Sequence, residues 1–276
     1  MIRIGSAWRI TSMMTLGMIE NWSEAGFRKV AGHGLKAIEF CYNIGQDPTA
    51  LMALAGDVRG WRDATGVKVG AVGRWGTDKL AKDGAVIEDE LKGSKTMIDF
   101  CAAVGAPVFN TGVNFVEGLS LLDNCNAAAG FLGELVDYGK AKGVKIATYN
   151  CHWNNFVREP SAWKLVHGKL PDLGLKYDSS HTINSGSGDY LGEIAEWGDR
   201  IYHVHVKGTL NVHGKHVDDP PAGLDMINWR AEMGLLYAKK YDGMLSIEPH
   251  SGVWKGEMGE WGVRFTIDYI REMIYG

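Results

Sequence analysis

The sequence lacks an excess of positive charge. Its 276 residues contain 29 Lys and Arg against 33 Asp and Glu, which gives a formal net charge of −4. A nucleic-acid-binding surface needs clustered Lys and Arg, so this composition argues against a nucleic-acid partner. No apolar run approaches the length of a membrane span, which argues against a membrane partner as well.

The sequence also lacks the marks of secretion. Residues 1–5 lead straight into a strand-like pattern, without the basic-then-apolar form of a signal peptide. The four cysteines, Cys41, Cys101, Cys125 and Cys151, show no CxxC spacing. We therefore expect reduced thiols rather than a disulfide framework, and a cytoplasmic protein.

No low-complexity segment or Pro/Ser-rich linker divides the chain, which predicts a single domain over residues 1–276. Short β-rich runs alternate with longer amphipathic stretches, the clearest of which are residues 121–142 and 229–240. The predicted strands are residues 3–7, 37–41, 68–72, 108–111, 144–150, 173–178, 202–206 and 244–248. Eight β-then-α units in a chain of this length predict an α/β fold, the (β/α)8 TIM barrel.

A doubly wound open sheet is the rival fold. Such a sheet usually carries a glycine-rich phosphate loop after its first strand, and residues 6–14 contain none. The longest irregular stretch, residues 207–228, follows the predicted seventh strand. Loops of this length inside compact domains are usually functional, and active sites of barrels lie on that side.

Metal-ligand side chains end four consecutive predicted strands. They are His152, Asp178, His205 and Glu248. A parallel barrel brings the carboxyl ends of its strands to one rim, so these four side chains could converge on one divalent cation. Carboxylates mixed with imidazoles suit Mn²⁺, Co²⁺, Zn²⁺ or Fe²⁺ better than an all-oxygen or thiolate-rich site would.

For a histidine considered by itself, a structural role competes with metal binding. A strand-end histidine such as His203 is more often a hydrogen-bonded structural group than a ligand, and His167 is expected to face solvent. The two carboxylates are harder to explain in this way. Glu248 ends the apolar run Met-Leu-Ser-Ile, where burial without a partner is costly, and the same holds for Asp178.

Three motifs carry a family resemblance. They are Tyr-Asp-Ser-Ser-His at residues 177–181, His-Val-His-Val-Lys at 203–207 and Ile-Glu-Pro-His at 247–250. Together they resemble the xylose-isomerase-like sugar isomerase/epimerase superfamily, whose members are single (β/α)8 barrels. The resemblance implies that Asp178 and His205 are metal ligands, that His181 contacts substrate, and that Glu248 both binds metal and transfers a proton. It also implies one divalent ion, with manganese preferred and cobalt, zinc, iron or magnesium as alternatives.

The fifth strand departs from the family pattern. The family usually places a metal-binding Glu there, often as Glu-Asn-His, whereas this chain reads Tyr149-Asn150-Cys151-His152. His152 is then the replacement ligand, or it shares with His181 the role of second acid/base group beside Glu248. Two outcomes stay open: epimerisation or isomerisation of a keto-sugar, and β-elimination from a 3-keto-glycoside by a lyase or hydratase.

The substrate expected is a small sugar without phosphate, because only Lys-Gly-Thr follows the seventh strand. Tryptophans near strand ends could stack on a sugar ring. The candidate substrate contacts are Asn150, His181, Lys207, Trp8 and Trp75. An endonuclease-IV-like repair enzyme would need more ligands and a basic groove, and a non-catalytic barrel would have no use for the acidic strand ends. Assembly into a homo-oligomer stays open.

Overall fold

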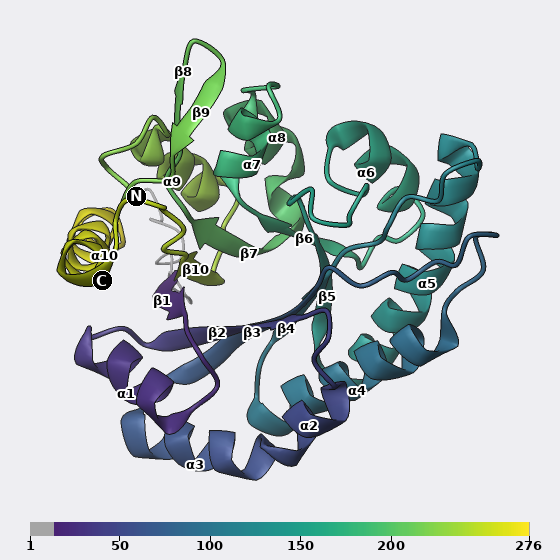
Figure 1. Ribbon diagram of the computed structural model, residues 1–276, viewed down its shortest axis with the longest axis horizontal. Helices are drawn as coiled ribbons and strands as arrows, with labels where there is room; N and C mark the ends of the chain where they lie inside the picture. The colour runs from purple at the N-terminus through teal and green to yellow at the C-terminus, as the bar shows by residue number, and fades with distance from the viewer. Residues whose placement is uncertain (1–13, 276) are drawn as a thin grey trace, which may run out of the picture.

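Eight parallel strands close into a barrel in the computed structural model, which describes residues 14–275 (Figure 1). The order around the barrel is β1-β2-β3-β4-β5-β6-β7-β10, and β10 pairs with β1 to close it. The barrel strands are β1 Thr15–Ile19, β2 Ala37–Asn43, β3 Lys68–Trp75, β4 Val108–Thr111, β5 Lys145–Tyr149, β6 Gly174–Tyr177, β7 Ile201–Val206 and β10 Met244–Ile247. The predicted TIM barrel is confirmed.

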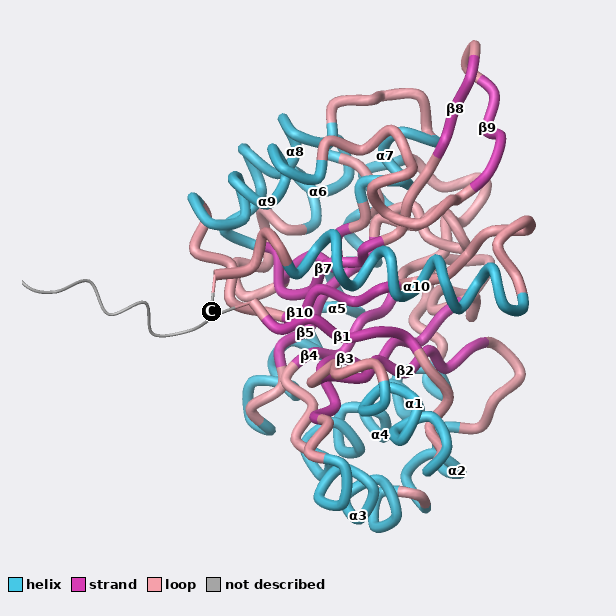
Figure 2. Tube along the Cα trace, turned by 90° about the vertical axis from the view of Figure 1, so that its left-hand side faces the viewer, coloured by secondary structure: helices cyan, strands magenta, loops and turns pink. Residues whose placement is uncertain are grey.

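Helices follow the strands and surround them (Figure 2). They are α1 Glu24–Gly32, α2 Pro48–Ala53, α3 Ala55–Thr65, α4 Glu88–Val104, α5 Leu121–Lys142, α6 Pro160–Val166, α7 Ser179–Asn184, α8 Tyr190–Trp197, α9 Trp229–Ala238 and α10 Gly256–Arg271, with a 3-10 turn at Gly198–Arg200. Over residues 14–275, none of these helices is both long enough and apolar enough to cross a bilayer.

Local sequence fixes the ends of the long helix α5. The Ser120 hydroxyl accepts a hydrogen bond from the Asp123 backbone N–H at 3.1 Å, which satisfies one of the free donors of the first turn. At the other end Gly143 takes a left-handed conformation with φ of 72°. Both bounds agree with the predicted range of 121–142.

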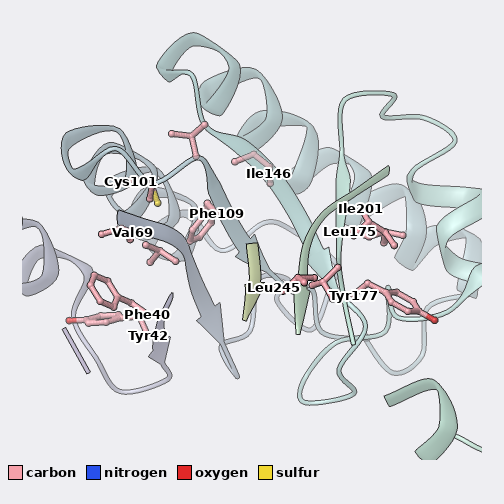
Figure 3. Packing of buried hydrophobic residues seen from close by; sticks show 14 of the residues in the cluster. Phe40, Tyr42, Val69, Cys101, Phe109, Ile146, Leu175, Tyr177, Ile201 and Leu245 are labelled. Carbon is pink, nitrogen blue, oxygen red and sulfur yellow. The ribbon is translucent and has the colours of Figure 1, made fainter. Parts of the chain in front are cut away.

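Alternation along each strand separates two kinds of packing. Outward side chains meet the helices: Phe40 of β2 lies 5.9 Å, between ring centroids, from Phe27 of α1 and 6.4 Å from Phe100 of α4. Figure 3 shows Phe40 and further buried residues on several strands. The next residue back along β2, Glu39, points inward and is fully buried.

The floor of the barrel depends on glycine. A Cβ added at Gly70 would lie 2.3 Å from the Met244 sulfur, and one at Gly17 would lie 2.5 Å from the Met244 methyl carbon. Met244 therefore fills space beside both glycines. Alanine at Gly70 would force this methionine to move, and alanine at Gly17 would in addition meet the Ala37 backbone oxygen at 2.3 Å.

Three expectations need correction or completion. The first described barrel strand is Thr15–Ile19, which was not among the predicted strands, and the predicted strand over residues 3–7 lies outside the described residues. The stretch 207–228 is not wholly irregular: it contains an antiparallel hairpin, β8 Leu210–Val212 and β9 Lys215–Asp218, which projects from the barrel in both views. His167 is buried, not solvent-facing, and its Nε2 lies 2.9 Å from the Thr148 hydroxyl.

Candidate metal centre

The carboxyl ends of β6, β7 and β10 bring Asp178, His205 and Glu248 together. One ligand atom from each lies within 4.8 Å of the other two. The His205 Nδ1 atom is 3.0 Å from Glu248 Oε2 and 3.8 Å from Asp178 Oδ2. Two carboxylates and one imidazole therefore converge on one point at the rim, a donor set that suits a first-row divalent metal.

Asp178 offers one carboxylate oxygen to this point. Its Oδ1 caps α7, accepting hydrogen bonds from the Ser180 backbone N–H at 3.0 Å and from the Ser180 hydroxyl at 2.6 Å. Its Oδ2 is buried and meets no described donor in good hydrogen-bond geometry, although the Lys207 ammonium lies 3.2 Å from it. A buried carboxylate oxygen is costly unless a cation faces it, and a metal ion in the place of that ammonium would fit the residues present.

Glu39 is the member of the centre that sequence reasoning missed. From β2 it reaches across the barrel to two histidines of β7: His203 Nε2 lies 2.8 Å from its Oε2, and His205 Nε2 lies 2.9 Å from the same oxygen. Burial would raise the pKa of Glu39, but the two imidazoles hold it well below its usual value. Glu39 is therefore an acceptor for both rings.

This contact selects the nitrogen that His205 turns toward the centre. Because a carboxylate only accepts, His205 donates through Nε2 to Glu39 and through Nδ1 to Glu248 at 3.0 Å, and a metal ion bound at Nδ1 would take the place of that second proton. A ligating histidine usually donates its other ring N–H to such a group. The sequence signal was an acid within the apolar strand Ala37–Asn43, on its inward face.

Asn150 stands in place of the expected carboxylate. Both ends of its side-chain amide form hydrogen bonds with the backbone of Asp178. Its Nδ2 donates to the Asp178 carbonyl at 2.9 Å, and its Oδ1 accepts from the Asp178 N–H at 3.0 Å. The side chain thereby ties the end of β5 to the end of β6. In this arrangement it positions Asp178, and its oxygen is already engaged.

His152 and His181 form a neighbouring group. Ligand atoms of Cys151, His152 and His181 lie within 4.8 Å of one another, and His181 Nε2 is 3.4 Å from Asp178 Oδ2. Three of the four predicted ligands thus meet, while His152 is exposed and sits beside His181. Burial lowers the pKa of His181 to about 3, although Asp178 opposes that shift, so this imidazole is neutral near pH 7.

Two buried lysines complete the centre. Lys207, with a side chain 4% exposed, places its Nζ 3.2 Å from Asp178 Oδ2 and 3.4 Å from Glu248 Oε2. Burial would lower the pKa of Lys207, but the two carboxylates raise it above its usual value. Lys176 is 1% exposed, and its Nζ lies 3.7 Å from Asp178 Oδ2. Within the described chain this second ammonium has no hydrogen-bond partner.

The amino-acid sequence matches the family described as "Xylose isomerase-like TIM barrel" over residues 27–272. The chain belongs to this family. Among curated proteins, none matches it.

Solved structures share the same xylose isomerase-like barrel. A xylose isomerase domain protein from Planctomyces limnophilus is 15% identical, with a TM-score of 0.76 over 95% of this chain and 97% of that one. The 3-keto-D-glucoside 4-epimerase of E. coli is 16% identical, with a TM-score of 0.72 over 94% and 99%. An L-ribulose 3-epimerase is 18% identical, with a TM-score of 0.74 over 95% and 94%. At these identities the likeness establishes the fold alone.

Of the two predicted tryptophan contacts, the structure describes Trp75. Trp75, at the end of β3, is only 6% exposed and stacks on Tyr149 with ring centroids 3.8 Å apart. One face of its ring is therefore covered by protein. Trp8 lies outside the described residues.

A polar cavity of about 320 Å³ opens beside the centre. Its lining comes from the segment after β5 and from α7 and α8, and consists of Asn150, His152, Arg158, Glu159, Pro160, His181, Thr182, Asn184, Ser185, Ser187 and Glu193. His181 belongs both to this wall and to the surroundings of Asp178. A ligand in the cavity would therefore touch the residues that border the metal centre.

Proposed function

We propose that this chain is a divalent-metal-dependent enzyme that enolises a keto-sugar or sugar derivative, as a sugar isomerase or epimerase does. The observation that carries the proposal is the convergence of Asp178, His205 and Glu248 at one rim of the barrel. Membership of the xylose isomerase-like family and the sugar epimerases among the structural neighbours support the substrate class.

Asp178, His205 and Glu248 would hold the ion, with manganese preferred because the donor set mixes oxygen with one nitrogen. When bound, a divalent metal supplies a Lewis acid beside the substrate carbonyl. His152 as a fourth ligand stays a prediction. Its place beside His181 equally supports the other role that we propose for it, donation of a proton to the substrate from the exposed side of the centre.

Glu248 is proposed as the base. Its side chain is 23% exposed, whereas Asp178 is fully buried, so Glu248 is the carboxylate that a substrate can reach. Burial would raise the pKa of Glu248, but Lys207 and His205 hold it well below the usual value. Glu248 is therefore ionised at neutral pH and ready to accept the proton next to the carbonyl.

The second candidate function is a metal-dependent lyase that cleaves 3-keto-glycosides by β-elimination. The observation that favours it is Asn150, which brings no carboxylate and is engaged with the backbone of Asp178. A two-base epimerisation needs a second proton acceptor on the opposite face of the sugar. Elimination needs only one proton removed, by Glu248, and one leaving group protonated, for which His152 is the candidate.

The Glu248→Gln variant tests the catalytic assignment. It should keep the folded barrel and, with Mn²⁺ added to saturation, should lose exchange of the substrate α-hydrogen with D₂O by about 100-fold or more, because an amide cannot accept that proton. Exchange can be followed by NMR on a ketose and on a 3-keto-glucoside. Unimpaired exchange in this variant would show that another group is the base.

The same two substrates separate the two functions. An isomerase or epimerase converts the ketose and releases nothing from the glycoside. A lyase releases the aglycone and leaves the ketose unchanged. Wild-type protein without activity on either substrate, in the presence of Mn²⁺, would contradict the proposed function.

A further inference from the structure

The space between Asp178 and Glu248 already holds a cationic group. The Lys207 Nζ atom lies 3.2 Å from Asp178 Oδ2 and 3.4 Å from Glu248 Oε2, the two oxygens that also face His205 Nδ1. Its third close contact is His181 Nε2, at 3.1 Å. Lys207 thus contacts two of the three atoms that a metal would need.

Co-occupation of this space is physically unfavourable. Metal–oxygen bonds in such sites measure about 2.0–2.2 Å, so an ion bound to both carboxylates would sit within a few ångströms of the ammonium. Repulsion between a dication and a lysine at that distance is strong in a buried site. One of the two cations must leave.

The summed charge of the centre also favours the loss of one cation when a metal binds. Glu39, Asp178 and Glu248 contribute three negative charges, and Lys176 and Lys207 contribute two positive ones, all on side chains that are buried or nearly so. With the imidazoles neutral, as a metal on His205 Nδ1 requires, the side chains sum to −1, and a dication would change this sum to +1. If the Lys207 ammonium moves away, the remaining charges, −2 from the protein and +2 from the metal, balance.

We propose that Lys207 is the internal counter-ion of the metal centre and that a divalent cation binds by displacing its ammonium group. The inference rests on the metal site of the proposed function. In the metal-free protein the Lys207 ammonium shields the ligand carboxylates from water and offsets the repulsion between them, so the ligands stay in place. After displacement the Lys207 ammonium keeps His181 as its partner. Because His181 lines the polar cavity, the ammonium then turns toward the substrate.

The consequence is a weakened affinity for the metal, since each ion must replace an existing ion pair. Removing the lysine charge should therefore tighten metal binding, the opposite of what removal of a ligand does. Lys207→Met removes the ammonium and keeps an unbranched apolar stem, and Lys207→Gln keeps a polar end without charge. Both variants should bind Mn²⁺ at least tenfold more tightly than the wild type in a titration with MnCl₂ alone, followed by calorimetry or by the electron spin resonance of free Mn²⁺.

Lys79→Met is the matched control. Lys79 is likewise buried, with a side chain 1% exposed, and pairs with a glutamate, Glu90, at 2.8 Å, but it belongs to a different cluster. Its loss should lower the melting temperature without changing Mn²⁺ affinity. Mn²⁺ should raise the melting temperature of both Lys207 variants by more than it raises that of the wild type.

Wild-type Mn²⁺ affinity in the Lys207 variants, or a weaker one, would overturn the inference. In that case, binding of Mn²⁺ by the wild type but not by Asp178→Asn would still support the proposed metal site. Absence of binding in the wild type and in both Lys207 variants would overturn the metal site and this inference together. Failure of both Lys207 variants to fold even with Mn²⁺ present would also count against displacement.

Discussion

Two clusters in this barrel pair buried lysines with carboxylates, and they differ in the sign of their excess charge. In the metal centre Lys207 faces two carboxylates, those of Asp178 and Glu248. In the second cluster, beyond the end of β3, one carboxylate faces two cations: Glu90 accepts from Lys79 at 2.8 Å and from Arg74 at 2.9 Å.

The difference appears in the lysines themselves. Burial lowers the pKa of Lys79 to about 8, although Glu90 opposes the shift, whereas the carboxylates around Lys207 outweigh burial and raise its pKa. A cluster with surplus cations is a closed structural ion pair. The cluster with surplus carboxylates around an imidazole is the one in which we propose that the lysine is exchanged for a metal.

The largest expected effect is the removal of a carboxylate from each cluster. Asp178→Asn should weaken Mn²⁺ binding more than about 100-fold, because it removes the charge of a ligand carboxylate. Glu90→Gln should leave Mn²⁺ affinity unchanged and should lower the free energy of unfolding by about 1–3 kcal/mol, because it leaves two buried cations unpaired. Calorimetric titration and chemical denaturation measure both. Equal loss of metal in the two variants would remove the distinction between the clusters.

A smaller effect is expected at Glu39, which touches the centre only through His203 and His205. Glu39 accepts from two imidazole N–H groups. In Glu39→Gln one carboxylate oxygen becomes an NH₂ group, so the amide cannot serve both N–H groups without turning a donor toward one of them. Mn²⁺ affinity should fall roughly 10- to 100-fold, the usual cost of losing the partner of a ligating histidine. Unchanged affinity, with the protein folded, would mean that His205 does not depend on Glu39 for its orientation.

Glu232 sharpens the comparison because it is a buried carboxylate without a lysine. It accepts from the Ser179 hydroxyl at 2.7 Å, and burial, aided by Asp178, raises its pKa from 4.5 to about 8. The folded protein therefore binds a proton here that the unfolded chain releases above pH 4.5, so this stability is lost as pH rises toward 8.

Glu232→Gln should abolish that loss. The variant should match the wild type near pH 4.5 and exceed it by on the order of 2 kcal/mol in free energy of unfolding at pH 8. Urea denaturation at several pH values between these limits follows the difference. A difference between the two proteins that does not change with pH would show that Glu232 is ionised in the folded state.

Much of this arrangement could be predicted from sequence because strand alternation and strand-end position are local signals. The bounds of β4 and α5 follow from Val108–Thr111 and Leu121–Lys142 directly. The meeting of Asp178, His205 and Glu248 follows from the rule that parallel strands end at one rim. The hairpin β8–β9 had a weaker signal, a His213-Gly214 pair whose φ angles of 52° and 74° suit a tight turn.

The remainder depends on contacts across the barrel that no local pattern encodes. Glu39 lies 164 residues before His203, so its role could be read only from their separation in space. The strand Thr15–Ile19 was not predicted because so short a run is ambiguous by itself, and its pairing with β2 and β10 is what places it in the barrel. His167 was misplaced because its helix context did not reveal Thr148 beneath it.

Diffraction from crystals soaked in MnCl₂, recorded at the manganese absorption edge, tests the central claim most directly. We predict one anomalous peak bonded to Asp178 Oδ2, His205 Nδ1 and Glu248, with the Lys207 ammonium moved away from both carboxylates. A peak held by Cys151, His152 and His181 instead, or full Mn²⁺ exposure with no peak and Lys207 still between Asp178 and Glu248, would contradict the account.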